Sequence, residues 1–441
     1  MEEKEFRSKK KSEVEESFRK KGTLLFGAFA LGSFSLVFFG APQILPLSYN
    51  TGDGNQAAVS TSTPSNGNSD EKEDDGFKPI YLPTPEPLKA IYMSQCVAGT
   101  PSFRERLVKL IEETELNSVI IDVKDYTGKI GFPTNNPKLK ESVSDQCGAR
   151  DMREFVKMLN ERGIYTIARI TVFQDPYYTH AYPELAVKKE SDKNAIWKDY
   201  KGLSFIDVGS KPFWDYIVEI SKETYKIGFD ELNYDYIRFP SDGPMRDIYY
   251  PFSDEKLARD PDYGKANVLK EFFAYLDKEM ENTGAVLSAD IFGMTTTNYD
   301  DLNIGQVLEY AEPHFDYIAP MVYPSHYPSG FIGLSNPNSD PYKVIHYSMS
   351  RAVERLTALT TPFALVGEER IGTSTPAIYS YTPKNKLKLR PWLQDFDYGG
   401  DYDVEEVRAQ MQATYDAGLT SWMLWDPSNR YTRGALQNAE E

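Results

Sequence analysis

From residue 87 onward, short apolar runs rich in β-forming residues alternate with amphipathic stretches of helical period. This alternation is typical of βα units, in which helices join parallel strands. Eight runs have the length and composition of strands: 89–93, 118–123, 165–172, 231–236, 286–291, 317–322, 388–393 and 421–425. Eight such units over about 350 residues predict a TIM (β/α)8 barrel with long βα loops. A doubly wound open sheet is the alternative, but no glycine-rich phosphate loop follows the first run.

Two of the intervening stretches carry clear helix boundary signals. The stretch 102–113 begins with Ser102 and Glu105 at the spacing of a capping box, in which each side chain caps a backbone amide of the other residue. The stretch 404–417 is followed by Gly418, and glycine is the residue type that most often ends a helix. These signals predict a helix over each stretch.

The fourth run carries acidic side chains on a strand that should be buried. Because strand side chains alternate between two faces, one face presents Glu231, Asn233 and Asp235. Burying charged groups is costly unless they are paired or hydrogen-bonded, so this polar row needs a reason. A salt-bridged edge strand is the structural explanation, and a reactive site is the functional one. The functional explanation is favoured because other predicted strands also end in charged or polar residues.

Polar and aromatic residues gather where the predicted strands end. In a TIM barrel the active site lies at the C-terminal ends of the strands, on the βα loops. The residues expected at this rim are Asp122, Lys124, Arg169, Asp235, Arg238, Asp290, Tyr323, Trp392, Trp422, Trp425 and Asp426. Their convergence predicts a single site, in which Glu231 and Asn233 also contact the substrate.

Asp235 and Asp290 end neighbouring strands, which lie about 4.8 Å apart, so their carboxyl groups are expected roughly 5–6 Å from each other. Two carboxyl groups at that separation are typical of a retaining glycosidase. We therefore predict that Asp235 is the nucleophile and Asp290 the general acid/base. A hydrogen-bonded barrel residue is the alternative for Asp290.

A retaining mechanism needs one carboxyl group ionised and the other protonated, which the environment must arrange. Arg169, Lys124 and Arg238 are the candidate cations beside the ionised group. Asp122 and Asp426 are candidate acceptors for sugar hydroxyls, although either residue is equally well explained as part of an ion pair.

Three long loops, 174–213, 240–265 and 324–341, follow strand ends and are rich in aromatic residues. Aromatic rings stack on the C–H faces of sugars, so these loops and the rim residues Tyr323, Trp392, Trp422 and Trp425 fit the walls of a carbohydrate cleft. For any single loop aromatic, packing of the loop is the simpler explanation.

Residues from about 87 to 436 resemble a bacterial family of domains of unknown function that are held to be glycoside hydrolases. The resemblance rests on the segments 119–125 (VIIDVKD), 168–173 (ARITVF), 233–240 (NYDYIRFP), 288–293 (SADIFG), 319–323 (APMVY) and 422–426 (WMLWD). It implies a TIM-barrel glycoside hydrolase and names no sugar.

Two better-known barrel families are similar at a distance. Asn233-Tyr-Asp235 resembles the nucleophile strand of α-galactosidase-like barrels, whose acid/base follows the sixth strand, where this chain has the segment 323–326 (YPSH). The segment 321–323 (MVY) resembles the chitinase-like barrels, but Ile237 stands where their catalytic glutamate is found. The resemblance therefore does not extend to substrate-assisted hydrolysis of N-acetyl sugars.

The first 84 residues differ in kind from the rest. A basic tail, 1–21, precedes an uncharged run, 22–47, that is long enough to cross a bilayer as a helix. No Lys or Arg follows until Lys72, which predicts a cytoplasmic N-terminus and an extracytoplasmic domain. We expect an uncleaved single-pass anchor, with a cleaved signal peptide as the alternative. A polar, acidic stretch, 48–84, predicts a flexible linker before a barrel domain over 85–436.

The composition limits which partners and cofactors are expected. The formal net charge of -17 argues against a nucleic acid partner, because phosphate backbones are bound by clustered Lys and Arg. The only cysteines, Cys96 and Cys147, follow the first two runs, so a disulfide is feasible and two free thiols remain the alternative. The four histidines show no paired spacing, so we expect no zinc or other transition-metal site and no cofactor. Calcium among the acidic loops is the alternative left open.

The sequence therefore predicts a membrane-anchored, extracytoplasmic glycoside hydrolase that acts on a cell-envelope or environmental polysaccharide. The alternative is a non-catalytic barrel that uses the same cleft to bind carbohydrate, since fold-level similarity carries part of the argument.

Overall fold

The structure, a computed structural model, describes residues 76–439. Eight parallel strands close into a barrel in the order β1-β10-β9-β6-β5-β4-β3-β2. The barrel strands are β1 (Lys89–Met93), β2 (Ser118–Lys124), β3 (Tyr165–Thr171), β4 (Glu231–Asp235), β5 (Val286–Phe292), β6 (Tyr317–Met321), β9 (Trp392–Gln394) and β10 (Trp422–Trp425). The predicted (β/α)8 barrel is therefore confirmed, and the sheet is closed rather than open.

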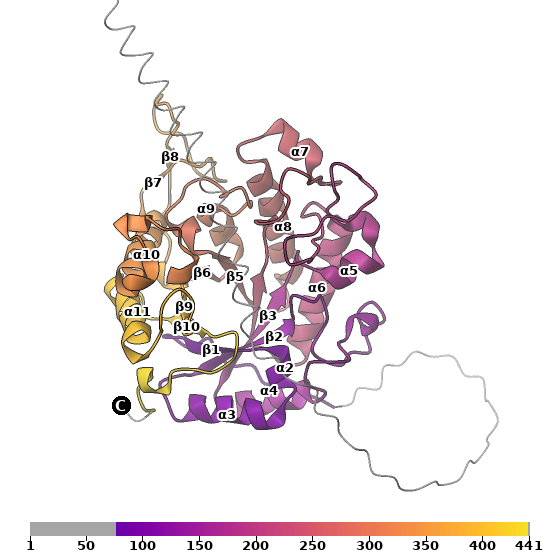
Figure 1. Cartoon of the computed structure of the whole chain (residues 1–441), viewed down its shortest axis with the longest axis vertical. Coiled ribbons are helices and arrows are strands. Elements are labelled where there is room, and N and C mark those ends of the chain that lie inside the picture. Colours follow the sequence, from indigo (N-terminus) through magenta and orange to yellow (C-terminus); the bar gives the residue numbers. More distant parts are fainter. Residues whose placement is uncertain (1–75, 440–441) are drawn as a thin grey trace, which may run out of the picture.

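Helices surround the strands (Figure 1). Those of two turns or more are α3 (Pro101–Glu112), α4 (Met152–Glu161), α6 (Lys211–Lys226), α8 (Gly264–Met280), α10 (Pro341–Thr357) and α11 (Val404–Asp416). Shorter helices lie in the loops: α2 (Gln95–Ala98), α5 (Pro176–Ala181), α7 (Asp254–Arg259) and α9 (Leu308–Ala311). The outward faces of the strands and the inward faces of these helices share one large apolar core.

The seventh barrel strand is shorter than predicted. Lys386–Lys388 forms a 3-10 helix, and β9 begins only at Trp392. Pro391 lacks the N–H that a continuous ladder needs, and Leu389 pairs with Ile318 as an isolated bridge. A two-stranded antiparallel hairpin, β7 (Thr360–Thr361) with β8 (Tyr379–Ser380), lies outside the barrel and was not predicted (Figure 1).

The two predicted helix boundaries fared differently. The capping box over Ser102 was wrong, because α3 begins at Pro101 with Thr100 as its N-cap and no side-chain cap. Proline suits the first helical position since its fixed φ already matches a helix. For α11 the helix is confirmed, and Asp403 and Glu406 form a capping box that was not anticipated.

The interior of the barrel is a second apolar cluster, separate from the outer core. Its buried members are Leu88, Ala90, Tyr92, Ile120, Tyr165, Ile167, Ala319, Tyr323, Trp392, Phe396 and Met423. The segment before β1 lies against the N-terminal end of the barrel: the Leu82 amide donates to Asp230 at 2.6 Å, and Thr84 Oγ1 lies 3.0 Å from the Tyr165 hydroxyl. The long loops follow strands β3, β4 and β6, so they lie at the opposite, C-terminal end of the barrel.

The long loops after β3 and β4 pack on each other. Lys188 and Tyr249 form an antiparallel bridge between them, and Trp197 Nε1 donates to the Pro244 carbonyl at 3.2 Å. Trp197, like Tyr327 in the loop after β6, is buried. For these two aromatic residues the structure therefore shows loop packing.

Cys96 and Cys147 form a disulfide, with their Cα atoms 4.4 Å apart. It joins the loops that follow β1 and β2, so it lies at the C-terminal end of the barrel. Between residues 76 and 439, no helix is long and apolar enough to span a bilayer. The predicted anchor, 22–47, and most of the linker lie outside the described residues.

Candidate active site

Arg169 is the centre of a buried cluster of carboxyl groups at the C-terminal end of the barrel. Its Nη1 donates to Asp122 Oδ1 at 2.6 Å, its Nη2 donates to Asp235 Oδ2, and its Nε lies 3.7 Å from Asp290 Oδ2. Burial lowers the pKa of Arg169, but the charges of Asp122 and Asp235 raise it well above its usual value. These four side chains lie on the inner face of the barrel and come from the adjacent strands β2, β3, β4 and β5.

Asp235 is held by two donors. Besides the Arg169 guanidinium, the Tyr236 amide donates to Asp235 Oδ1 at 2.5 Å. Tyr236 adopts a left-handed backbone conformation, with φ of 52°, which is unfavourable for a side chain of this size. The turn ends β4 directly after Asp235. Hydrogen bonds from a guanidinium and an amide stabilise the ionised form of a carboxyl group.

The surroundings of Asp290 favour its protonated form instead. Burial, followed by the charge of Asp235, raises the pKa of Asp290 to about 8. Its Oδ1 accepts from Trp392 Nε1 at 2.7 Å and from Asn233 Nδ2 at 2.9 Å. These donors and Arg169 lower the pKa, but they do not offset burial. The protonated form of Asp290 is therefore favoured.

Asp122 secures the other side of Arg169. The Tyr92 hydroxyl donates to Asp122 Oδ2, and burial raises the pKa of Asp122 to about 6 despite the charge of Arg169. The Tyr431 hydroxyl in turn donates to the Tyr92 carbonyl at 2.5 Å. This chain of contacts fixes the guanidinium between Asp122 and Asp235.

Aromatic side chains line the cluster. The Trp425 ring stacks on Tyr92 with centroids 4.0 Å apart, lies edge-on to Trp392 at 5.6 Å, and has the Arg169 guanidinium 5.0 Å from its centroid. Tyr323 is buried, and burial together with the charges of Asp290 and Asp235 raises its pKa well above the usual value. Predicted residues from six strands and one strand end thus meet at one place.

Two of the predicted site residues lie away from this cluster. Lys124 is completely buried and pairs with Asp175 at 2.9 Å, because a register shift in β2 turns it toward the loop after β3. Glu231 lies at the N-terminal end of β4, where it pairs with Arg390 at 2.9 Å. Both contacts tie parts of the barrel together.

Three further predicted residues have local partners. The Arg238 guanidinium donates to the Phe239 carbonyl at 3.1 Å and lies 4.8 Å from the ring centroid of Tyr236. Trp422 packs in the outer core and donates to the Tyr415 hydroxyl at 2.8 Å. Asp426 accepts from the amide and hydroxyl of Ser428 at 2.5 and 2.6 Å, which shapes the turn after β10.

The predicted site residues did not include Tyr92 or Tyr236. Ser288 accepts from Asn233 Nδ2 at 3.1 Å and so helps to orient that amide. Tyr92 sits four residues into β1, opposite Ile120 of β2 and on the same inner face as Asp122. An inward-facing tyrosine on a strand beside an acidic one was the available signal.

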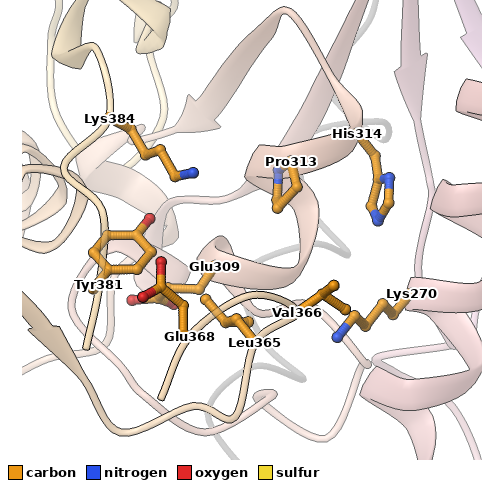
Figure 2. A pocket seen from close by; sticks show the side chains of 9 residues that line it. All are labelled: Lys270, Glu309, Pro313, His314, Leu365, Val366, Glu368, Tyr381 and Lys384. Carbon is orange, nitrogen blue, oxygen red and sulfur yellow. The ribbon is translucent and has the colours of Figure 1, made fainter. Parts of the chain in front are cut away.

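A pocket outside the barrel shares no residue with the carboxyl cluster. It lies among α8, α9 and the segment that carries β7 and β8, and it is lined by Lys270, Glu309, Pro313, His314, Leu365, Val366, Glu368, Tyr381 and Lys384 (Figure 2). Glu309 is already paired with Arg355 at 2.5 Å. Throughout residues 76–439, no group of three or more His, Cys, Asp or Glu side chains is arranged to hold a metal ion.

Comparison with known proteins identifies a family for most of the described chain. The model of a family described as "Putative glycosyl hydrolase domain" matches residues 90–431. No curated protein matches the chain. A hypothetical protein from Ruminiclostridium thermocellum ATCC 27405 is 30% identical over 45% of this chain and 96% of its own, with a TM-score of 0.39.

Two solved structures are more distant in sequence. The glycoside hydrolase domain of PgaB (BpsB) from Bordetella bronchiseptica is 15% identical, with a TM-score of 0.52 over 80% of this chain and 99% of that domain. The spore cortex-lytic enzyme SleL from Bacillus megaterium QM B1551 is 9% identical, with a TM-score of 0.42 over 81% of this chain and 75% of its own. The likeness to PgaB shows a shared fold.

Proposed function

Because the chain belongs to this family of glycosyl hydrolase domains, we propose that it is a membrane-anchored, extracytoplasmic glycoside hydrolase with a retaining two-carboxylate mechanism. Its substrate in this proposal is a cell-envelope or environmental polysaccharide. The family membership supports the hydrolase activity, and the carboxyl cluster supports the mechanism.

The observation that carries the mechanism is the contrast between two carboxyl groups that share one guanidinium. Arg169 Nη2 and the Tyr236 amide donate to Asp235, which favours a carboxylate. Burial and the charge of Asp235 raise the pKa of Asp290 to about 8, which favours a protonated acid. A retaining glycosidase needs one carboxyl group that is ionised and one that is protonated.

In the first step, Asp235 attacks the anomeric carbon while Asp290 donates its proton to the glycosidic oxygen, and the bond between that oxygen and the anomeric carbon breaks. The product is a covalent glycosyl ester on Asp235 and a free leaving-group hydroxyl. In the second step Asp290, now a carboxylate, takes a proton from water, whose oxygen replaces Asp235 at the anomeric carbon. The sugar leaves with its original configuration, and both carboxyl groups return to their starting states.

Membrane anchoring rests on the sequence. The uncharged run 22–47 follows a basic tail, and a polar linker separates it from the barrel. The described chain enters at the N-terminal end of the barrel, where Leu82 and Thr84 contact Asp230 and Tyr165. An anchor on this side would leave the carboxyl cluster facing away from the membrane.

One observation favours the second candidate, a carbohydrate-binding barrel without catalysis. The side chains of Asp235 and Asp290 are only 6% and 1% exposed, and both contact Arg169. Substrate can reach them only if the aromatic residues around the cluster move. In a receptor they would serve as a buried ion-pair network beneath the binding surface.

Product analysis separates the two candidates. The full-length chain in detergent is incubated with a panel of α- and β-linked oligosaccharides, and proton NMR follows the anomeric signals from the first turnover. A released sugar with the anomeric configuration of its substrate supports the retaining hydrolase. Release of the opposite anomer would contradict the nucleophile role of Asp235, and glycan binding without release would support the receptor.

A further inference from the structure

The two oxygens of Asp290 have different surroundings. Oδ1 accepts from Trp392 Nε1 at 2.7 Å and from Asn233 Nδ2 at 2.9 Å. Oδ2 accepts from neither of these donors and lies 3.7 Å from Arg169 Nε. Arg169 also donates to Asp235 through Nη2, so Oδ2 is the Asp290 oxygen nearest the guanidinium that the two carboxyl groups share.

A protonated carboxyl group has one carbonyl oxygen and one hydroxyl oxygen, and hydrogen-bond donors prefer the carbonyl oxygen. An indole N–H is a donor only and cannot accept a proton from Asp290. With Trp392 and the amide of Asn233 both aimed at Oδ1, that oxygen is the carbonyl. The proton is therefore left to Oδ2.

We propose that Trp392 and Asn233 are positioning residues that keep the acid proton of Asp290 on Oδ2, the oxygen beside the Arg169 guanidinium that also holds Asp235. This inference rests on the proposed acid/base role of Asp290 and specifies which oxygen performs it. A proton on Oδ1 would lie against the N–H groups of Trp392 and Asn233. A proton on Oδ2 lies where the glycosidic oxygen must sit between the two carboxyl groups.

Both positioning residues are firmly held. Trp392 begins β9, is 1% exposed, and packs edge-on against Trp425. Asn233 lies in the middle of β4, is also 1% exposed, and its Nδ2 has Ser288 Oγ as a second acceptor at 3.1 Å. Side chains fixed by strands and by packing hold a reacting group in place more precisely than side chains on loops.

The same two donors serve the second half of the reaction. After Asp290 has given up its proton, its carboxylate keeps both hydrogen bonds at Oδ1, which stabilise the charge. They lower the pKa of Asp290, in opposition to burial. Oδ2 is then the oxygen free to take a proton from water. Trp392 and Asn233 thus make one oxygen both the acid and the base.

The test is infrared difference spectroscopy of the full-length chain without any substrate, so it does not depend on turnover. The C=O stretch of protonated Asp290 is identified as the band that disappears in Asp290→Asn. Hydrogen bonds to a carbonyl oxygen lower its stretching frequency. Trp392→Phe is therefore expected to move the band to higher frequency and to raise its titration midpoint by roughly one to two pH units.

Asn233→Ala removes the second donor and should shift the band and the midpoint in the same direction, which provides an independent test should Trp392→Phe fold poorly. The matched control is Trp422→Phe, since Trp422 is equally buried but donates to Tyr415. In that variant the band and its midpoint should stay in place. A band that stays in place in both Trp392→Phe and Asn233→Ala, or moves to lower frequency, would overturn the assignment of the proton to Oδ2.

The outcome is separable from that of the proposed function. If Asp290→Asn still hydrolyses glycans, the acid/base role fails, whereas the infrared result on the position of the proton still stands. If hydrolysis is lost in Asp290→Asn and the infrared band does not respond to Trp392→Phe or Asn233→Ala, the acid is right and the positioning role is wrong.

Discussion

Replacing Arg169 with methionine removes a cation that contacts Asp122, Asp235 and Asp290. Breaking a buried ion pair by removing one partner costs about 3–5 kcal/mol, because the other charge is left buried and uncompensated. The full cost applies when the carboxyl groups are ionised. We therefore expect Arg169→Met to lower the free energy of unfolding by about 3–5 kcal/mol at pH 8.

The loss should be smaller at pH 5. The pKa of Asp122 is raised to about 6 and that of Asp290 to about 8, so both groups are largely protonated at pH 5. Without Arg169 these folded-state pKa values rise further, and the folded variant binds more protons than the folded parent as pH increases. The stability of the variant must then fall more steeply with rising pH.

Urea unfolding followed by circular dichroism at pH 5 and pH 8 measures both effects. The matched control is Arg259→Met, because the side chains of Arg259 and its partner Glu255 are 72% and 78% exposed. An exposed pair contributes about 0–1 kcal/mol, so this control should change little at either pH. An equal loss at the two pH values, or a loss for Arg169→Met no larger than that of the control, would refute the reasoning.

Three other predictions follow from buried groups. The pKa of Asp290 is about 8 in the folded chain against an ordinary 3.8, so the free energy of unfolding of the parent falls as pH rises between these two values. Asp290→Asn lacks this titration, so its free energy of unfolding relative to the parent should rise by several kcal/mol between pH 5 and pH 8 in urea unfolding. An unchanged difference would contradict the raised pKa. The disulfide closes a separation of 51 residues, so replacing Cys96 and Cys147 with serine should cost about 4 kcal/mol in the same assay; no loss would argue against the bond. Lys124→Met leaves Asp175 buried without its cation and should cost about 3–5 kcal/mol while leaving the titration of the Asp290 infrared band unchanged; a shifted titration would place Lys124 in the site.

The barrel was predictable because its signals are local. Each of the eight strands is an apolar run between turn residues, and the count and spacing of the runs define the fold. The start of β9 was misplaced because Pro391 interrupts the ladder inside an otherwise strand-like run. The hairpin of β7 and β8 was missed because two-residue strands have no periodicity to read.

The site was predictable only in part, because partner choice depends on contacts distant in sequence. Inward-facing residues toward the C-terminal ends of strands, such as Arg169 and Asp290, were located by strand alternation together with the position of the active site in a TIM barrel. Lys124 was misplaced by one register shift in β2, which alternation does not reveal. Glu231 shares the face of Asp235 but lies at the other end of the strand, where Arg390 meets it. Direction along the strand mattered as much as the face.

The central claim is that Asp235 and Asp290 perform hydrolysis, and the most direct test is turnover of the oligosaccharide panel by the full-length parent, Asp235→Asn and Asp290→Asn. Asp230→Asn is the matched control: Asp230 directly precedes β4 at the N-terminal end of the barrel and accepts from Leu82 and Thr166. We predict product release by the parent and by the folded control, and none by Asp235→Asn or Asp290→Asn. Undiminished release by either of those two variants would contradict the account.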